Sequence, residues 1–121
     1  MADLTLWHNP RCSKSRAAKE LLDERGVPYV ERRYIDDAPS AEELDAVLAS
    51  LGVEPWEITR MGEPVARDLG LVAMRHDRAA WIDTLVQHPI LIERPILVTP
   101  DGRAAVGRPI GNIEALLDPS P

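Results

Sequence analysis

Cysteine, phenylalanine and long apolar runs are scarce or missing in this chain. The 121 residues include one cysteine, Cys12, and no phenylalanine. A single cysteine excludes a disulfide within the chain and is typical of a reducing compartment, so we expect a cytoplasmic protein. Without phenylalanine, the core must be built from leucine, isoleucine, valine and alanine, with tryptophan and tyrosine as its larger members. A chain of this length is sufficient for one domain.

Membrane and secretion signals are missing as well. No apolar run approaches the roughly 20 residues needed to cross a bilayer, and the first residues, Met1-Ala2-Asp3, do not resemble a secretion signal. The net charge of −6 argues against general binding to nucleic acid or to an anionic membrane. Any anion site must therefore be local and built from a few arginines.

The first 35 residues predict a strand, a helix and a second strand. Residues 4–7 are short and apolar, as in a buried strand, and apolar residues recur at helical spacing over residues 13–24. Residues 29–35 carry the β-branched and aromatic content of a strand. In such a unit the two strands run parallel and are joined by a right-handed crossover.

The rest of the chain predicts mainly helices, followed by a hairpin. Ser40 with Glu43 three residues later is a capping box, which predicts a helix that ends at Gly52. Asp101-Gly102 indicates a tight hairpin turn. The remaining expected elements are helical pieces near 55–61 and 64–69, a helix over 78–87, strand character at Leu91 and over 96–98, a strand over 104–106 and a helix over 113–117.

This order of elements is that of an α/β thioredoxin-like fold, β-α-β and then β-β-α, with a helical insertion between the halves. We expect a single thioredoxin-like domain over residues 1–118, in which the insertion occupies about 40–89. Residues 119–121 form a tail. The sequence contains no repeat and no linker that would indicate a second domain.

Cys12 lies where the first strand turns into the first helix, after the polar turn His8-Asn9-Pro10-Arg11. Unpaired backbone N–H groups and the helix dipole favour an anion at that point. They lower the pKa of a thiol and make the nucleophilic thiolate available. A lone cysteine can also be only a small buried apolar side chain. The polar and basic neighbours of Cys12 favour the reactive interpretation.

Two polar residues close to Cys12 are candidates for supporting the thiolate. A protonated His8 would stabilise it and lower its pKa, although a turn histidine can also simply face water. Ser15 occupies the position of the resolving thiol in a C-x-x-C motif, so no internal disulfide can resolve an adduct on Cys12. Its hydroxyl could donate to the thiolate, or it could serve only as a helix cap.

Three separated motifs in the same order resemble the glutaredoxin-linked arsenate reductase family. They are WHNPRC at residues 7–12, LIERPILV at 91–98 and VGRP at 106–109. The resemblance covers essentially the whole chain. It implies a thioredoxin-like fold and a cysteine that reacts with arsenate.

The resemblance also implies a set of arginines that hold the oxyanion: Arg60, Arg94 and Arg108. Arsenate beside a thiolate needs compensating positive charge, and arginine supplies it in a bidentate fork that never deprotonates. Arg94 and Arg108 fall within the matching motifs, whereas the sequence around Arg60 matches less closely. Pro95 corresponds to the proline that is cis in thioredoxin-like folds.

The reaction implied by the resemblance is reduction of arsenate to arsenite, which serves arsenic detoxification. Cys12 attacks arsenic, glutathione as co-substrate reduces the adduct, glutaredoxin clears the resulting mixed disulfide, and arsenite leaves Cys12 by hydrolysis. No bound cofactor is implied, and a monomer is the simplest expectation. His76 and His88 have no partner at metal-ligand spacing, so we expect no metal site.

Two other functions remain open at this stage. One is a glutathione-dependent thiol reductase of the same superfamily, which would not need three arginines around the sulfur. The other is a non-enzymatic redox regulator that binds RNA polymerase. Such regulators typically switch through C-x-x-C, and Ser15 removes that switch here. The fold by itself does not decide between these functions.

Overall fold

The computed structural model describes residues 4–117, and the tail expected at 119–121 lies outside them. The chain divides into two units. The first comprises the chain up to Asp37 and from Arg94 onward, and the second is Ala38–Glu93. That both belong to a single domain stays a prediction.

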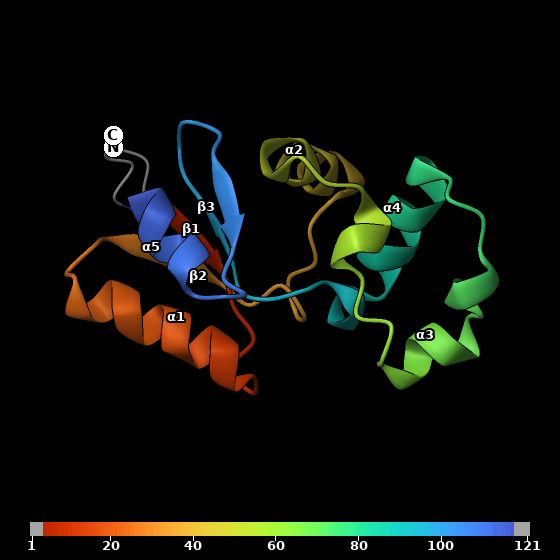
Figure 1. The fold of residues 1–121 in the computed structure, drawn as a ribbon, viewed down its shortest axis with the longest axis horizontal. Coiled ribbons are helices and arrows are strands. Elements are labelled where there is room, and N and C mark those ends of the chain that lie inside the picture. Colours follow the sequence, from red (N-terminus) through yellow and green to blue (C-terminus); the bar gives the residue numbers. More distant parts are fainter. Residues whose placement is uncertain (1–3, 118–121) are drawn as a thin grey trace. The chain divides into compact units, whose positions relative to one another are not determined.

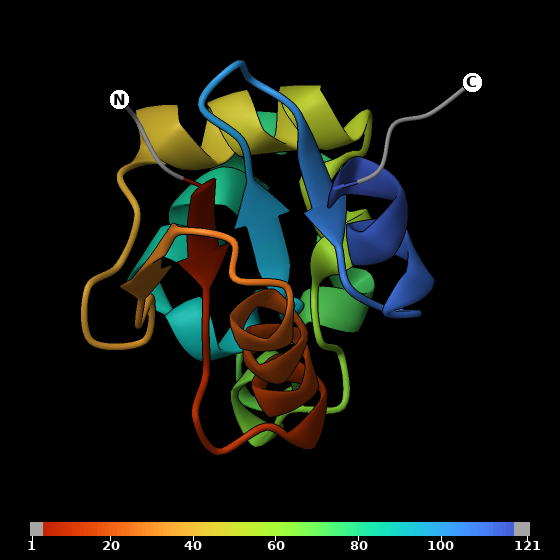
Figure 2. The same ribbon diagram turned by 90° about the vertical axis from the view of Figure 1, so that its left-hand side faces the viewer.

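A four-stranded mixed sheet forms the centre of the first unit (Figures 1 and 2). Its strands are β1 (Leu4–Trp7), β2 (Tyr29–Arg32), β3 (Ile96–Val98) and β4 (Ala104–Val106), in the spatial order β2-β1-β3-β4. β1 and β2 run parallel, whereas β3 is antiparallel to both β1 and β4. The predicted β-α-β and β-β-α halves therefore share one sheet, as in a thioredoxin-like fold.

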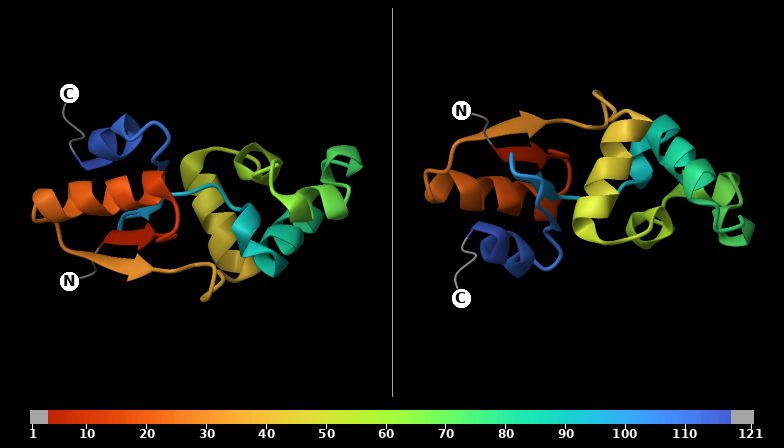
Figure 3. Two further views of the ribbon diagram at one scale, coloured as in Figure 1. Left: turned by 90° about the horizontal axis from the view of Figure 1, so that it is seen from below. Right: turned by 90° about the horizontal axis from the view of Figure 1, so that it is seen from above.

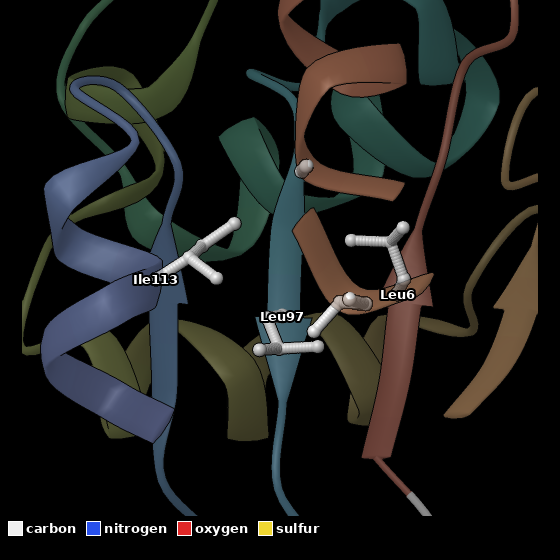
Figure 4. Packing of buried hydrophobic residues seen from close by; sticks show 5 residues of the cluster. Leu6, Leu97 and Ile113 are labelled. Carbon is white, nitrogen blue, oxygen red and sulfur yellow. The ribbon is translucent and has the colours of Figure 1, made fainter. Parts of the chain in front are cut away.

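Helices α1 (Ser13–Glu24) and α5 (Gly111–Leu117) cover the same face of this sheet (Figure 3). Leu6 of β1 pairs with Leu97 of β3, so the two side chains share that face. Both are fully buried together with Ala18 and Leu22 of α1 and Ile113 of α5 (Figure 4). This small core packs α1, the helix that follows Cys12, against the sheet.

The second unit is helical and confirms the predicted capping box. It contains α2 (Ala41–Leu51), α3 (Pro64–Asp68), α4 (Arg78–Gln87) and the 3-10 turns η1 (Pro55–Ile58), η2 (Leu71–Ala73) and η3 (Pro89–Leu91). The Ser40 hydroxyl accepts from the Glu43 N–H at 3.1 Å, and the Glu43 carboxylate accepts from the Ser40 N–H at 3.0 Å. Gly52 ends α2 with a φ of 70°, a conformation that favours glycine.

Several predicted boundaries differ from the structure, and η1 ends at Ile58 instead of residue 61. β2 ends at Arg32 instead of residue 35, because the chain then turns and the Arg33 carbonyl accepts from the N–H groups of Asp36 and Asp37. Leu91 belongs to η3 and not to a strand, since Pro89 at the first position favours a helical turn. α5 begins at Gly111, two residues before the predicted start.

Both arginine-proline pairs of the first unit have cis peptide bonds. The Arg94–Pro95 bond is cis, as the family resemblance implied, and the Arg108–Pro109 bond is cis as well, which was not predicted. The N–H of Gly107 donates to the Pro95 carbonyl at 2.8 Å. This bond links the chain just before β3 to the chain just after β4, and so brings Arg94 and Arg108 together.

We expect Gly107→Ala to destabilise the first unit by about 1–3 kcal/mol, as overpacking does. A Cβ at this position would lie 2.6 Å from Cδ1 of Ile113 and 2.8 Å from Cγ of Pro95. Ile113 is fully buried and cannot move away freely. Urea unfolding should show the loss. The matched control is Gly111→Ala, because a Cβ there meets nothing within 4 Å. Equal midpoints for the two variants would contradict this account of Gly107.

Candidate functional site

Cys12 is the N-cap residue of α1, with extended backbone angles of φ −99° and ψ 124°. It is the residue from which the helix starts, since its carbonyl accepts from the Arg16 N–H at 2.9 Å. Its side chain is 8% exposed. The first turn of α1 contains no acidic residue. The thiol is therefore buried at the positive end of a helix, where no helical carboxylate opposes a negative charge on it.

Asn9 fixes the turn that precedes the thiol. Its carbonyl accepts from the Cys12 N–H at 3.0 Å, and its side-chain oxygen accepts from the Arg11 N–H at 3.0 Å. The N–H of Asn9 donates to the Ser15 hydroxyl at 2.9 Å. The sequence did not single out Asn9, although Asn-Pro is a known turn former. These bonds join the turn to the first turn of the helix and hold the sulfur in one place.

Two arginines converge on the sulfur. Nη2 of Arg108 lies 3.3 Å from Sγ of Cys12, and Nε of Arg108 donates to the Arg94 carbonyl at 2.6 Å. Arg94 is 8% exposed, which is unusual for an arginine. Because β3 and β4 form a hairpin, Arg94, two residues before β3, lies beside Arg108, two residues after β4. The hairpin thus delivers both guanidinium groups to the start of α1.

The pKa of Cys12 is lowered, although burial works against the thiolate. Burial is the largest influence and by itself would raise the pKa. The backbone N–H of Ser15, the guanidinium of Arg94 and the backbone N–H of Lys14 outweigh it, and the charge of Arg94 adds to their effect. The direction agrees with the nucleophilic thiolate that the sequence predicts. The lowered pKa comes from the backbone N–H groups at the start of α1 together with the guanidinium of Arg94.

His8 lies in the turn before Cys12, in surroundings that act on its pKa. The imidazole is buried, with 2% of it exposed. Burial is the largest influence and lowers the pKa of His8, while the Glu31 carboxylate raises it and Lys19 and Arg33 lower it. The net pKa is below the ordinary value, so the neutral imidazole predominates at neutral pH. A lowered pKa disfavours the protonated His8 that was expected to stabilise the thiolate of Cys12, and its role in catalysis stays a prediction.

Ser15 supports the thiolate through its backbone. Its hydroxyl lies 2.7 Å from Nδ1 of His8 and accepts from the Asn9 N–H. Among residues 4–117, these are the hydrogen-bond partners of the hydroxyl, and the sulfur of Cys12 is not one of them. Donation of the Ser15 hydroxyl proton to Nδ1 would fit a neutral His8. His8 and Ser15 together therefore stabilise the turn. Of these two residues, only Ser15 acts on the thiolate directly, through its backbone N–H.

Arg60 belongs to the second unit, and its oxyanion role stays a prediction. Its guanidinium pairs with the Glu63 carboxylate, and its Nε lies 3.8 Å from an oxygen of Glu93. Its backbone N–H donates to the Leu91 carbonyl at 2.7 Å. Of the predicted site residues, the first unit brings together His8, Cys12, Ser15, Arg94 and Arg108.

Neither a metal centre nor a membrane-spanning helix occurs within residues 4–117. No group of three histidine, cysteine, aspartate or glutamate side chains in that range is placed to hold a metal ion. No helix within it is long and apolar enough to cross a membrane.

We expect alkylation of Cys12 by iodoacetamide to reach its half-maximal rate at a lower pH than alkylation of an ordinary thiol. The thiolate is the reacting form. Because the pKa of Cys12 is lowered, this thiolate forms at a lower pH than that of an ordinary thiol. Arg94→Gln removes a charge that favours the thiolate, so its midpoint should move to higher pH. Arg103→Gln, which changes an exposed arginine paired with Asp101, should leave the midpoint in place. A midpoint that does not differ between Arg94→Gln and the wild type would refute the role of Arg94.

Comparison with known proteins agrees with this geometry. The sequence model of the ArsC family matches residues 7–116. An arsenate reductase of Neisseria meningitidis serogroup A is 42% identical over 97% of this chain and 100% of its own length. An uncharacterised protein in the glnII region of Streptomyces viridochromogenes is 48% identical over 87% of this chain and 91% of its own. The solved structure of an arsenate reductase from Vibrio cholerae superposes with a TM-score of 0.86 at 35% identity, covering 94% of this chain and 98% of that one. The chain belongs to the ArsC family.

Proposed function

We propose that this protein reduces arsenate to arsenite, with Cys12 as the nucleophile and an external thiol as the reductant. The observation that carries the proposal is the contact between the sulfur of Cys12 and the guanidinium of Arg108, with Arg94 also acting on the sulfur. Positive charge at a reactive thiolate suits a substrate that is itself an anion. Relatives named as arsenate reductases over almost the whole chain support the choice of anion.

Binding of arsenate requires that its negative charge be balanced beside that of the thiolate. Arg94 and Arg108 supply two guanidinium groups, each able to form paired hydrogen bonds with a tetrahedral oxyanion. The N–H groups at the start of α1 add further donors. Arg60 is the third arginine in this proposal. In the second unit its guanidinium pairs with Glu63 and lies near Glu93.

The covalent step follows from the state of Cys12. Its thiolate attacks the arsenic atom of bound arsenate, a sulfur–arsenic bond forms, and an oxygen of arsenate leaves as water after taking up protons. Arg108 stays on the reacting centre as charge moves from sulfur to the oxygens. In this scheme His8 is neutral and acts as a positioning residue through Ser15. It does not stabilise the thiolate with a positive charge.

The reductant comes from outside the chain, because Cys12 is its only cysteine. Arsenic gains two electrons, and two external thiols lose them as one disulfide. One arsenate and two thiols thus give one arsenite, one disulfide and one water. We propose glutathione as the thiol and glutaredoxin as the protein that clears the mixed disulfide, acting on a cytoplasmic monomer. The absence of a resolving thiol at Ser15 supports an external reductant, and the family resemblance supports these two molecules.

We expect Cys12→Ser to abolish arsenite formation in an assay with arsenate, glutathione and glutaredoxin, because a serine hydroxyl is not ionised at neutral pH. Ser13→Ala, an exposed neighbour in the first turn of α1, should keep wild-type activity. Full activity of the serine variant would contradict the proposed function. Wild-type activity that does not change when glutathione is omitted would contradict the external reductant.

A further inference from the structure

The ten basic residues of the first unit divide into three groups. Five of them pair with a carboxylate, namely Lys19, Arg25, Arg32, Arg33 and Arg103. Arg94 and Arg108 belong to the site described above. Three others, Arg11, Lys14 and Arg16, have no carboxylate within ion-pair distance among residues 4–117, and all three are exposed. In a chain with a net charge of −6, this uncompensated positive group stands out.

All three of these residues lie within four positions of Cys12, and we call them the basic rim. Arg11 belongs to the turn before the thiol, whereas Lys14 and Arg16 belong to the first turns of α1. The Arg16 guanidinium donates to the Pro10 carbonyl at 2.9 Å and is thereby held against the turn. The side chains of Arg11 and Lys14 make no described hydrogen bond in residues 4–117. Their charges are therefore available to a ligand that approaches Cys12 from solvent.

We propose that the basic rim binds the carboxylate of a small anionic thiol and so positions this thiol for reaction at Cys12. The inference rests on the proposed function, since the thiol is its external reductant. Arsenate needs the guanidinium groups of the buried Arg94 and the half-buried Arg108 beside the sulfur, whereas the thiol must arrive afterwards from solvent. Exposed, unpaired basic side chains suit that second ligand. Glutathione, which carries two carboxylates, fits the basic rim, and a neutral thiol gains nothing from it.

The surface is probed by thiol–disulfide exchange, in which the Cys12 thiolate and a small disulfide supply every atom and electron. When this exchange has left Cys12 in a mixed disulfide with the small thiol, a second thiolate attacks the sulfur of the small-thiol half. The bond to Cys12 breaks, and its electron pair leaves with the Cys12 sulfur as a thiolate. In the reverse direction, the Cys12 thiolate attacks a small disulfide and releases one half as a thiolate. Both directions place the same carboxylated group beside the basic rim.

The test compares two disulfide probes on the wild type without arsenate. One probe is 5,5′-dithiobis(2-nitrobenzoate), with a carboxylate on each ring, and the other is the uncharged 2,2′-dithiodipyridine. All of the released colour reports Cys12, because the chain has no other thiol. We expect Arg11→Gln/Lys14→Gln to lower the rate ratio of the charged to the neutral probe about three- to tenfold. About 1 M salt should lower the same ratio in the wild type.

The matched control is Arg25→Gln/Arg103→Gln, which removes the same number of charges from the same unit. Arg25 is the C-cap of α1, and the twelve residues of that helix separate it from Cys12 by about 18 Å. The control should keep the wild-type ratio. An unchanged ratio in Arg11→Gln/Lys14→Gln, or equal slowing with both probes, would overturn the proposal. Equal slowing would mean that the substitutions act on the thiolate itself and not on the ligand.

Steady-state arsenate reduction then separates this inference from the function on which it rests. The Arg11→Gln/Lys14→Gln variant should raise the KM for glutathione and leave the KM for arsenate unchanged. If the wild type reduces no arsenate with any thiol, the proposed function fails, and the probe ratio still decides on the basic rim. If the variant slows only the step that depends on glutaredoxin, the surface binds a protein, and our assignment to a small thiol is wrong.

Discussion

Burial and charge compensation have opposite effects on the pKa of Cys12. The chemistry of the candidate site in the first unit depends on which effect is larger. Burial favours the neutral thiol, whereas the N–H groups at the start of α1 and the guanidinium of Arg94 favour the thiolate. The second influence prevails, and the pKa is lowered. The thiol is thus shielded from solvent, and its pKa lies below that of an ordinary thiol. The same donors that stabilise its negative charge are suited to an oxyanion placed next to it.

The fold supplies these donors from parts of the chain that are far apart in sequence. The core between the sheet, α1 and α5 holds the helix start in place, and the Asn9 turn sets the position of the sulfur. The β3–β4 hairpin then brings Arg94 and Arg108 to that point, 96 residues separating Cys12 from Arg108. Gly107 lets the chain after β4 lie close to Pro95 and Ile113, since a Cβ at this position would collide with both side chains. Stability and chemistry therefore depend on the same few contacts.

Local signals in the sequence predicted most of the fold, and the parts that failed depend on tertiary surroundings. The capping box at Ser40 and the helix at 13–24 could be predicted because their patterns are local. The position of Cys12 at the start of this helix could be predicted for the same reason. The direction of the pKa shift of His8 could not be predicted, because it depends on burial and on the charges of Glu31, Lys19 and Arg33. The family resemblance implied Arg108 only as an oxyanion ligand. Local patterns could not predict its contact with the sulfur, because Arg108 lies 96 positions after Cys12.

The most direct test of the central claim is whether arsenate protects Cys12. The rate of alkylation by iodoacetamide would be measured at neutral pH with increasing arsenate, in the wild type and in Arg108→Gln. Arsenate held beside the sulfur predicts a rate that falls to a plateau in the wild type, with protection lost in the variant. An alkylation rate independent of arsenate, or equal protection in both proteins, would contradict an oxyanion site built from Cys12 and Arg108.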